Sequence, residues 1–175
     1  MKIPLVVLLS VNILFVQCHK KHDPTPLEQL PPATQTGAET FGCLLNGQAW
    51  KPKGFNGTGN YSVDYDPGYQ GGTLNIFTYR LEQKGDQHIV LYSDSLTRVG
   101  IYPLTRRHHS GALFSDEKTG CEFLQDGPQY QAGALTITRL DLTAGIIAGT
   151  FHFKLYQPGC DSVIITEGRF DKKLF

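Results

Sequence analysis

From Glu39 onward, apolar and polar residues alternate along the chain, and glycine, proline, asparagine or aspartate interrupts the alternation at short intervals. The run "GTFHFKLY" would have one apolar and one polar face. The apolar face would carry Phe151, Phe153 and Leu155, and the polar face would carry Thr150, His152 and Lys154. Such a period of two is typical of antiparallel strands with one face in water. No segment shows an apolar stripe at helical spacing, so a second sheet, or the same sheet closed on itself, must cover the apolar face.

We therefore predict an all-β fold, an antiparallel β-sandwich of about eight to ten strands, with a closed β-barrel as the alternative. Asn46-Gly47 lies between two apolar runs and predicts a hairpin, because both central residues of a type I′ turn need positive φ. A second hairpin is expected around Lys84-Gly85-Asp86. Further strands are expected in the segments "RVGIYPL", "TGCEFLQ", "ALTITRLDL", "GIIAGTFHFKLY" and "SVIITEGRFD".

Size and charge limit the number of domains and the kinds of partner. The 175 residues, 40% of them hydrophobic, suffice for one domain with a real core, which we place at residues 37–175. Lysine plus arginine equals aspartate plus glutamate, 16 each. With no net positive field to attract a polyanion, we expect no nucleic-acid partner.

The first 17 residues read as an export signal. Lys2 precedes the apolar stretch "IPLVVLLSVNILFV", which is too short for a comfortable membrane span. Cys18 follows, and Leu14 to Cys18 loosely fits the motif that directs lipidation of a cysteine, in a form similar to that of Bacteroidota lipoproteins. The alternative is an incidental cysteine in an ordinary leader or an uncleaved anchor. We expect residues 1–17 to be a lipoprotein signal peptide and Cys18 to carry the lipid, including palmitate-type acyl chains.

Residues 18–36 would then connect the lipid to the domain. Four prolines and no apolar periodicity predict an extended tether, which at about 3.1 Å per residue reaches roughly 50 Å. The basic "HKKH" directly after Cys18 favours the periplasmic side of the outer membrane over the cell surface.

Three cysteines remain inside the domain, an odd number for an oxidising compartment. Cys121 and Cys160 each follow a turn glycine, and we expect a disulfide between them. Cys43 lies mid-strand at a core position, so we expect it to be buried and free.

The segment 55–72, "FNGTGNYSVDYDPGYQGG", carries tyrosines at a spacing of four: Tyr61, Tyr65 and Tyr69. Flat amphipathic rings could stack on a sugar or a peptide. The alternative is a mobile loop whose tyrosines pack back on the sheet.

Motifs that carry catalysis are missing from the sequence: it has no G-x-S-x-G, H-E-x-x-H, C-x-x-C or phosphate-binding glycine loop. His108 and His109 are adjacent and would point to opposite faces of a strand. His88 and His152 read as outward-facing strand residues. We expect no catalytic residues, no metal, no cofactor and no enzymatic activity.

Two blocks of sequence, "TGAETFGCLLNGQAW" and "ITRLDLTAGIIAGTFHF" with "ITEGRFD", together resemble a family of uncharacterised Bacteroidota lipoproteins, a domain of unknown function. The resemblance runs from Gly37 to the C-terminus and implies an exported, lipid-anchored β domain with no catalytic residues to transfer. In physical terms, we expect Trp50 to pack where the first hairpin meets the core, and Arg169 or Asp171 to form a structural ion pair.

The sequence thus favours a lipid-anchored cell-envelope protein that acts as a non-enzymatic binding or structural module. Its partners would be the membrane, through the lipid, and a glycan or an envelope protein. One alternative is a carbohydrate-binding accessory protein that uses the tyrosine segment. Another is a hydrolase with an unrecognised site.

Overall fold

The structure is a computed structural model that describes residues 22–105, 109–124 and 127–175, so the leader and Cys18 lie outside the described residues. Within this part of the chain the ordered elements are all strands: β1 (Thr40–Leu45), β2 (Gln48–Trp50), β3 (Tyr61–Asp66), β4 (Thr73–Arg80), β5 (Gln87–Ser93), β6 (Gly100–Pro103), β7 (Ser110–Asp116), β8 (Cys121–Phe123), β9 (Tyr130–Asp141), β10 (Ile146–Tyr156) and β11 (Val163–Lys173).

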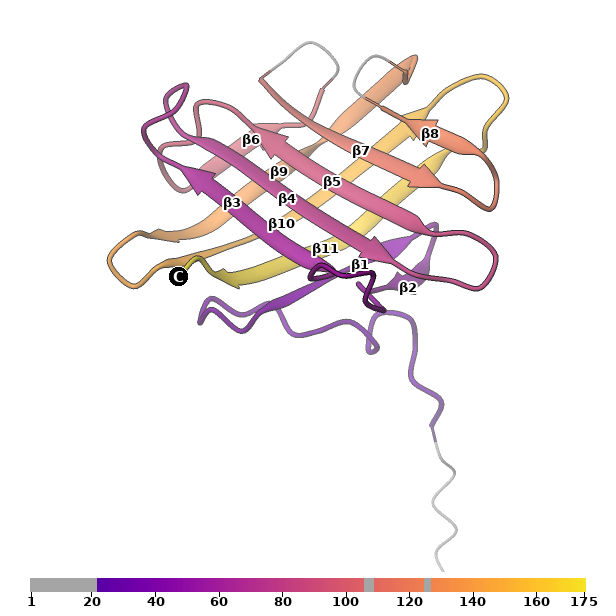
Figure 1. Cartoon of the computed structure of the whole chain (residues 1–175), viewed down its shortest axis with the longest axis horizontal. Coiled ribbons are helices and arrows are strands. Elements are labelled where there is room, and N and C mark those ends of the chain that lie inside the picture. Colours follow the sequence, from indigo (N-terminus) through magenta and orange to yellow (C-terminus); the bar gives the residue numbers. More distant parts are fainter. Residues whose placement is uncertain (1–21, 106–108, 125–126) are drawn as a thin grey trace, which may run out of the picture.

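The strands form two antiparallel sheets that lie face to face (Figure 1). Sheet A has six strands in the order β2-β1-β11-β10-β9-β6, and sheet B has five in the order β3-β4-β5-β7-β8. The predicted β-sandwich is confirmed. The alternative, a closed β-barrel, is wrong, because the strands form two separate sheets.

Eleven strands exceed the expected eight to ten, because β3 and β7 were not predicted from the sequence. β3 lies in the segment expected to be a loop, where glycines on both sides hide the alternation of "YSVDYD". In β7 the run Gly111-Ala112-Leu113-Phe114 does not alternate between apolar and polar residues, so the sequence gives no strand signal there. Alternate residues of the strand nevertheless face the core.

The core lies between the inner faces of the two sheets, and aromatic rings form its centre beside β1. Phe41 stacks on Phe151 at 5.1 Å between ring centroids and meets the edge of Trp50 at 6.0 Å. Trp50 is 1% exposed, so the prediction that it packs where the first hairpin meets the core is confirmed. Cys43 is fully buried and free, as expected.

Both predicted hairpins are present. Asn46 and Gly47 have φ of 47° and 80°, the left-handed values that a type I′ turn requires. The Asn46 side chain also accepts a hydrogen bond from the Ile164 amide at 2.8 Å, which ties this turn to β11. Gly85, with φ of 128°, occupies the turn between β4 and β5.

The segment that precedes β1 lies on the outer face of sheet A instead of extending freely up to residue 36. Leu30 is 8% exposed. The buried carboxylate of Asp171 on β11 accepts hydrogen bonds from Thr34 Oγ1 at 2.7 Å and from the amides of Thr36 and Gly37 at 2.8 Å each. The contacts of the domain therefore begin at Leu30, and residues 25–30 form a hydrogen-bonded turn where an extended chain was expected.

A structural ion pair was expected at Arg169 or Asp171 on the last strand. Arg169 forms an ion pair, and Asp171 forms hydrogen bonds instead. Asp171 is satisfied by hydroxyl and amide donors. Arg169 pairs with Glu167 on its own strand at 3.1 Å, where the Glu167 side chain is 54% exposed. An exposed ion pair of this kind contributes little to stability. The Asp171 carboxylate, in contrast, holds the segment before β1 against β11.

We predict that Asp171→Asn lowers the free energy of unfolding by about 2–3 kcal/mol at pH 7, because an amide NH2 would face donors that now bind a carboxylate. Burial raises the pKa of Asp171, but the hydrogen bonds from Thr34, Thr36, Gly37 and Ala38 outweigh it and hold the pKa below its usual value. The stabilisation is therefore present above the unfolded-state pKa of about 4 and is lost as the pH falls through the lower folded-state pKa.

Urea unfolding at pH 7 and at pH 3 measures this effect. The wild-type chain is expected to lose more stability between the two pH values than the Asp171→Asn variant. Glu167→Gln, which removes an exposed carboxylate from the same strand, serves as the control and should change stability by less than about 0.5 kcal/mol. Equal effects of the two substitutions would contradict the anchoring role of Asp171.

Candidate functional site

One end of sheet B finishes in a row of polar residues that face the other sheet. Arg80 pairs with Gln87, Gln87 with Asp116, and Asp116 with Cys121, so the four lie side by side across β4, β5, β7 and β8. Their position at the ends of strands places them at the mouth of the sandwich, on the right in Figure 1.

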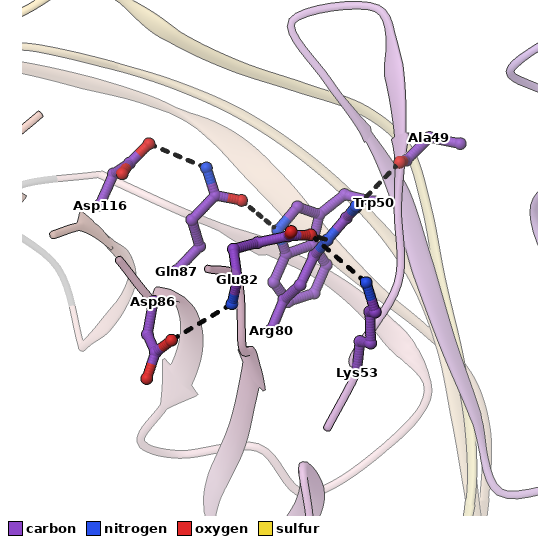
Figure 2. Close-up of polar contacts among 8 residues, drawn as sticks. All are labelled: Ala49, Trp50, Lys53, Arg80, Glu82, Asp86, Gln87 and Asp116. Carbon is purple, nitrogen blue, oxygen red and sulfur yellow. Dashed lines mark hydrogen bonds and ion pairs between the residues drawn. The ribbon is translucent and has the colours of Figure 1, made fainter. Parts of the chain in front are cut away.

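Trp50 connects this row to sheet A. Its indole Nε1 donates a hydrogen bond to Gln87 Oε1 at 2.9 Å, and Gln87 Nε2 donates to Asp116 Oδ2 at 2.8 Å (Figure 2). Because an indole can only donate and a carboxylate can only accept, this chain of hydrogen bonds fixes the orientation of the Gln87 amide. The buried tryptophan thus holds the two sheets at a defined separation.

Arg80 forms a second bridge beside the first (Figure 2). It donates to the backbone oxygen of Ala49 on β2 at 3.4 Å and to Glu82 Oε1 at 2.5 Å. The Lys53 ammonium lies 4.0 Å from the same Glu82 oxygen. The hydrogen bond and charge of Arg80, with a smaller effect of Lys53, lower the pKa of Glu82 below its usual value. Glu82 is therefore ionised and shared between two cations.

The predicted disulfide between Cys121 and Cys160 is present. It joins β8 of sheet B to the loop between β10 and β11 of sheet A, and both cysteines line the same end of the sandwich. Burial raises the pKa of the remaining thiol, Cys43, which keeps it protonated and unreactive.

These bridges surround a cleft of about 1080 Å³. Side chains of the inner sheet faces form its floor, among them Trp50, Phe114 and Phe123. Its rim comes from the turns at this end and is lined by Asn46, Gln48, Lys53, Glu82, Gln83, Lys84, Lys118, Thr119, Asp161 and Ser162. A volume of this size holds a ligand of several sugar or amino-acid units.

Charge is unevenly distributed around the rim. Lys84 and Lys118, in the turns of sheet B, have no acidic partner within the described part of the chain. Asp161, in the loop of sheet A, likewise has no cationic partner among the described residues. The rim therefore carries unpaired charges of both signs beside the ion pairs of Glu82, an arrangement that suits a ligand with both kinds of charge.

The structure does not bring the three predicted tyrosines together on one open surface. Tyr61 and Tyr65 lie on β3 and face inward, because residues four apart on a strand share a face. Tyr61 packs on Phe41 at 5.6 Å, and Tyr65 donates to the Leu96 oxygen at 2.8 Å. Burial, together with the charges of nearby carboxylates, raises the pKa of Tyr61. Tyr69 is 58% exposed in the turn after β3, and so stands alone.

The histidines that the structure describes do not line the cleft. His152 is exposed on β10, and the His109 ring lies 3.9 Å from Asp94 at the end of β5. His108 and Cys18 lie outside the described residues. Across residues 22–105, 109–124 and 127–175, no three His, Cys, Asp or Glu side chains come close enough together to hold a metal ion. In the same ranges no helix is long and apolar enough to cross a membrane.

Reasoning from the sequence missed the polar row itself. Arg80, Gln87 and Asp116 each stand where a strand meets its turn, a place where polar residues are ordinary. One signal was available in β5, where the apolar inward positions Ile89 and Leu91 are preceded at the strand start by the polar Gln87.

Comparison with known proteins gives one family. The family model described as "Domain of unknown function (DUF6252)" matches residues 43–172. A search of curated proteins and a search of solved structures each returned no match. The matched range runs from Cys43 on β1 to Lys172 on β11 and includes every strand that contributes to the cleft. The chain belongs to the DUF6252 family.

Proposed function

We propose that this chain is a lipid-anchored cell-envelope protein whose sandwich acts as a non-enzymatic binding module. The lipid would be attached to Cys18, after removal of residues 1–17, and the domain would face the periplasm from the outer membrane. The apolar leader, the position of Cys18 and the proline-containing segment that follows support this proposal. The observation that carries the binding role is the cleft at the end of the sandwich.

Three properties of the cleft support binding rather than a purely structural role. Its walls are held apart by the Trp50–Gln87–Asp116 chain and by the disulfide, so the opening exists before a ligand arrives. A preformed site avoids the entropy cost of ordering on binding. Its accessible lining is mixed polar and apolar, and its rim carries unpaired charges of both signs, which favours a short peptide or a peptide-bearing polymer of the envelope.

Trp50 provides the test, because it is the single tryptophan of the chain and its indole bonds to a residue of the cleft. A Cys18→Ala form of the full chain would be titrated with soluble peptidoglycan fragments, whose peptides carry free carboxylates and amines. We expect a saturable shift in Trp50 emission, since a ligand in the cleft changes the environment of Gln87 and Trp50.

Reversal of one unpaired charge at the rim of the cleft provides the matched comparison. Lys118→Glu is expected to weaken binding about tenfold or more, because it replaces an attractive charge with a repulsive one at the rim. Arg98→Glu makes the same change in charge in the exposed loop after β5, at the opposite end of the sandwich, and should leave binding unchanged. Emission that stays constant with every fragment, or equal weakening by both variants, would contradict a ligand in the cleft.

A further inference from the structure

Two tyrosines face each other on the outer face of sheet A. Tyr130 on β9 and Tyr156 on β10 are direct partners in the strand register. Their side chains point to solvent and are 50% and 41% exposed. Neither hydroxyl has a hydrogen-bond partner among the described residues. Directly opposed strand residues lie about 5 Å apart at the backbone, so the two rings stand beside each other on the same face and both line a shallow hollow.

The neighbours of this pair extend the surface without covering it. Lys154, two residues before Tyr156, shares its face, and the small side chain of Ala132 lies opposite Lys154. Ile164, the partner of Lys154 on β11, is 42% exposed. A shallow hollow of about 350 Å³ lies here, lined by Tyr130, Lys154, Tyr156 and Ser162. We call these four residues the tyrosine platform.

The platform lies at one end of the long β9–β10 strand pair of sheet A. β9 and β10 pair over their whole length, from Ile146–Asp141 at one end to Tyr156–Tyr130 at the other. Side chains on long paired strands are held more precisely than side chains on loops. The backbone beneath the two rings is therefore held by strand pairing before any ligand binds.

The chemistry of the platform favours a sugar. A pyranose ring offers a C–H face that packs on an aromatic ring, and hydroxyls at its edge that bond to polar neighbours. The free hydroxyls of the tyrosines and of Ser162 can supply those bonds. Lys154 has no acidic partner within the described residues, so its ammonium can bind a carboxylate of the ligand. One cation beside two rings matches an acidic sugar better than a polyanion such as nucleic acid.

We propose that the tyrosine platform binds an acidic oligosaccharide. Sugar rings stack on Tyr130 and Tyr156, the carboxylate of a uronic acid binds Lys154, and Ser162 bonds to a ring hydroxyl. This inference concerns the outer face of a sheet and does not depend on ligand binding in the cleft, although Ser162, in the loop between β10 and β11, borders both the platform and the cleft.

The test is calorimetric titration of the full chain carrying Cys18→Ala with tetramers of galacturonate, glucuronate and mannuronate, and with the neutral methyl ester of each. We expect at least one acidic tetramer to bind with a dissociation constant below about 1 mM. Tyr130→Ala and Tyr156→Ala should each weaken that binding about tenfold. Lys154→Gln should abolish the preference for the acid over its methyl ester while the ester still binds.

Tyr69→Ala is the matched control, because it removes an exposed tyrosine outside the platform, and it should leave binding unchanged. Lys118→Glu in the cleft should also have no effect, which separates this proposal from the one above. Absence of binding by all three acids at millimolar concentration would overturn the proposal, as would equal losses in the Tyr69 and platform variants.

Sedimentation of the same variants tests a different occupant. If the chain is a dimer that Tyr130→Ala dissociates, the face is a contact between two copies and the proposal is wrong. The platform variants alter half-exposed side chains on the outer face of the sheet, so their thermal unfolding temperature should lie within a few degrees of wild type. A monomer with unchanged unfolding and reduced glycan binding is the result we expect.

Discussion

Replacing Cys18 with alanine is expected to move nearly all of the protein from the membrane fraction to the soluble fraction. Acyl chains contribute about 0.8 kcal/mol per buried methylene, and two or three chains on one residue hold a protein essentially permanently. Within the described residues the two sheets bury apolar faces against each other, so we expect the lipid, and not the sandwich, to provide the attachment. Fractionation of cells that express the variant, followed by immunoblotting, measures the change.

Cys43→Ala is the control for this experiment. It removes a different cysteine, one buried in the core, and should leave the protein in the membrane fraction. The wild-type protein should also resist extraction with high salt and leave the membrane only in detergent. A Cys18→Ala variant that remains with the membrane would show that the apolar leader or the folded domain provides the attachment, which would contradict lipidation.

Removal of the disulfide is expected to have the second large effect. The double variant Cys121→Ser, Cys160→Ser should lower the free energy of unfolding by about 4 kcal/mol, because the bond closes a loop of 39 residues in the unfolded chain. For a domain of this size the loss corresponds to a fall of about 10–15 °C in Tm. The disulfide also connects β8 to the loop after β10, so the rim of the cleft should become more mobile in the variant.

Reductant gives an independent check on this prediction. Treatment with dithiothreitol should lower the Tm of the wild-type protein to a value close to that of the double variant. The Tm of the double variant itself should not change on treatment. The buried Cys43 thiol, with its raised pKa, is not expected to exchange with the disulfide. A double variant within about 1 kcal/mol of wild type would show that the bond is unimportant for stability.

The features that could be predicted from the sequence are those determined by residues close together in the chain. Alternation along β10 and the Asn46-Gly47 turn identify strands and a hairpin without reference to any distant residue. The disulfide could be predicted because Cys121 and Cys160 both adjoin turns, and because the location expected from the leader is oxidising. β3 was missed because its alternation spans only six residues between glycine-rich turns.

The cleft and the anchoring of the N-terminal segment could not be predicted, since both depend on which strands become neighbours. Gln87 gains its role from Trp50 and Asp116, which lie 37 and 29 residues away in the sequence. Asp171 binds Thr34, 137 residues away. The tyrosine platform arises in the same way, because Tyr130 and Tyr156 become partners only through the register of β9 and β10.

The measurement that bears most directly on this account is the intact mass of the mature protein, extracted from membranes in detergent. The account predicts a chain that begins at Cys18 and carries the added mass of two or three acyl chains. A mature chain that begins at any other residue, or that begins at Cys18 without acyl chains, would contradict it.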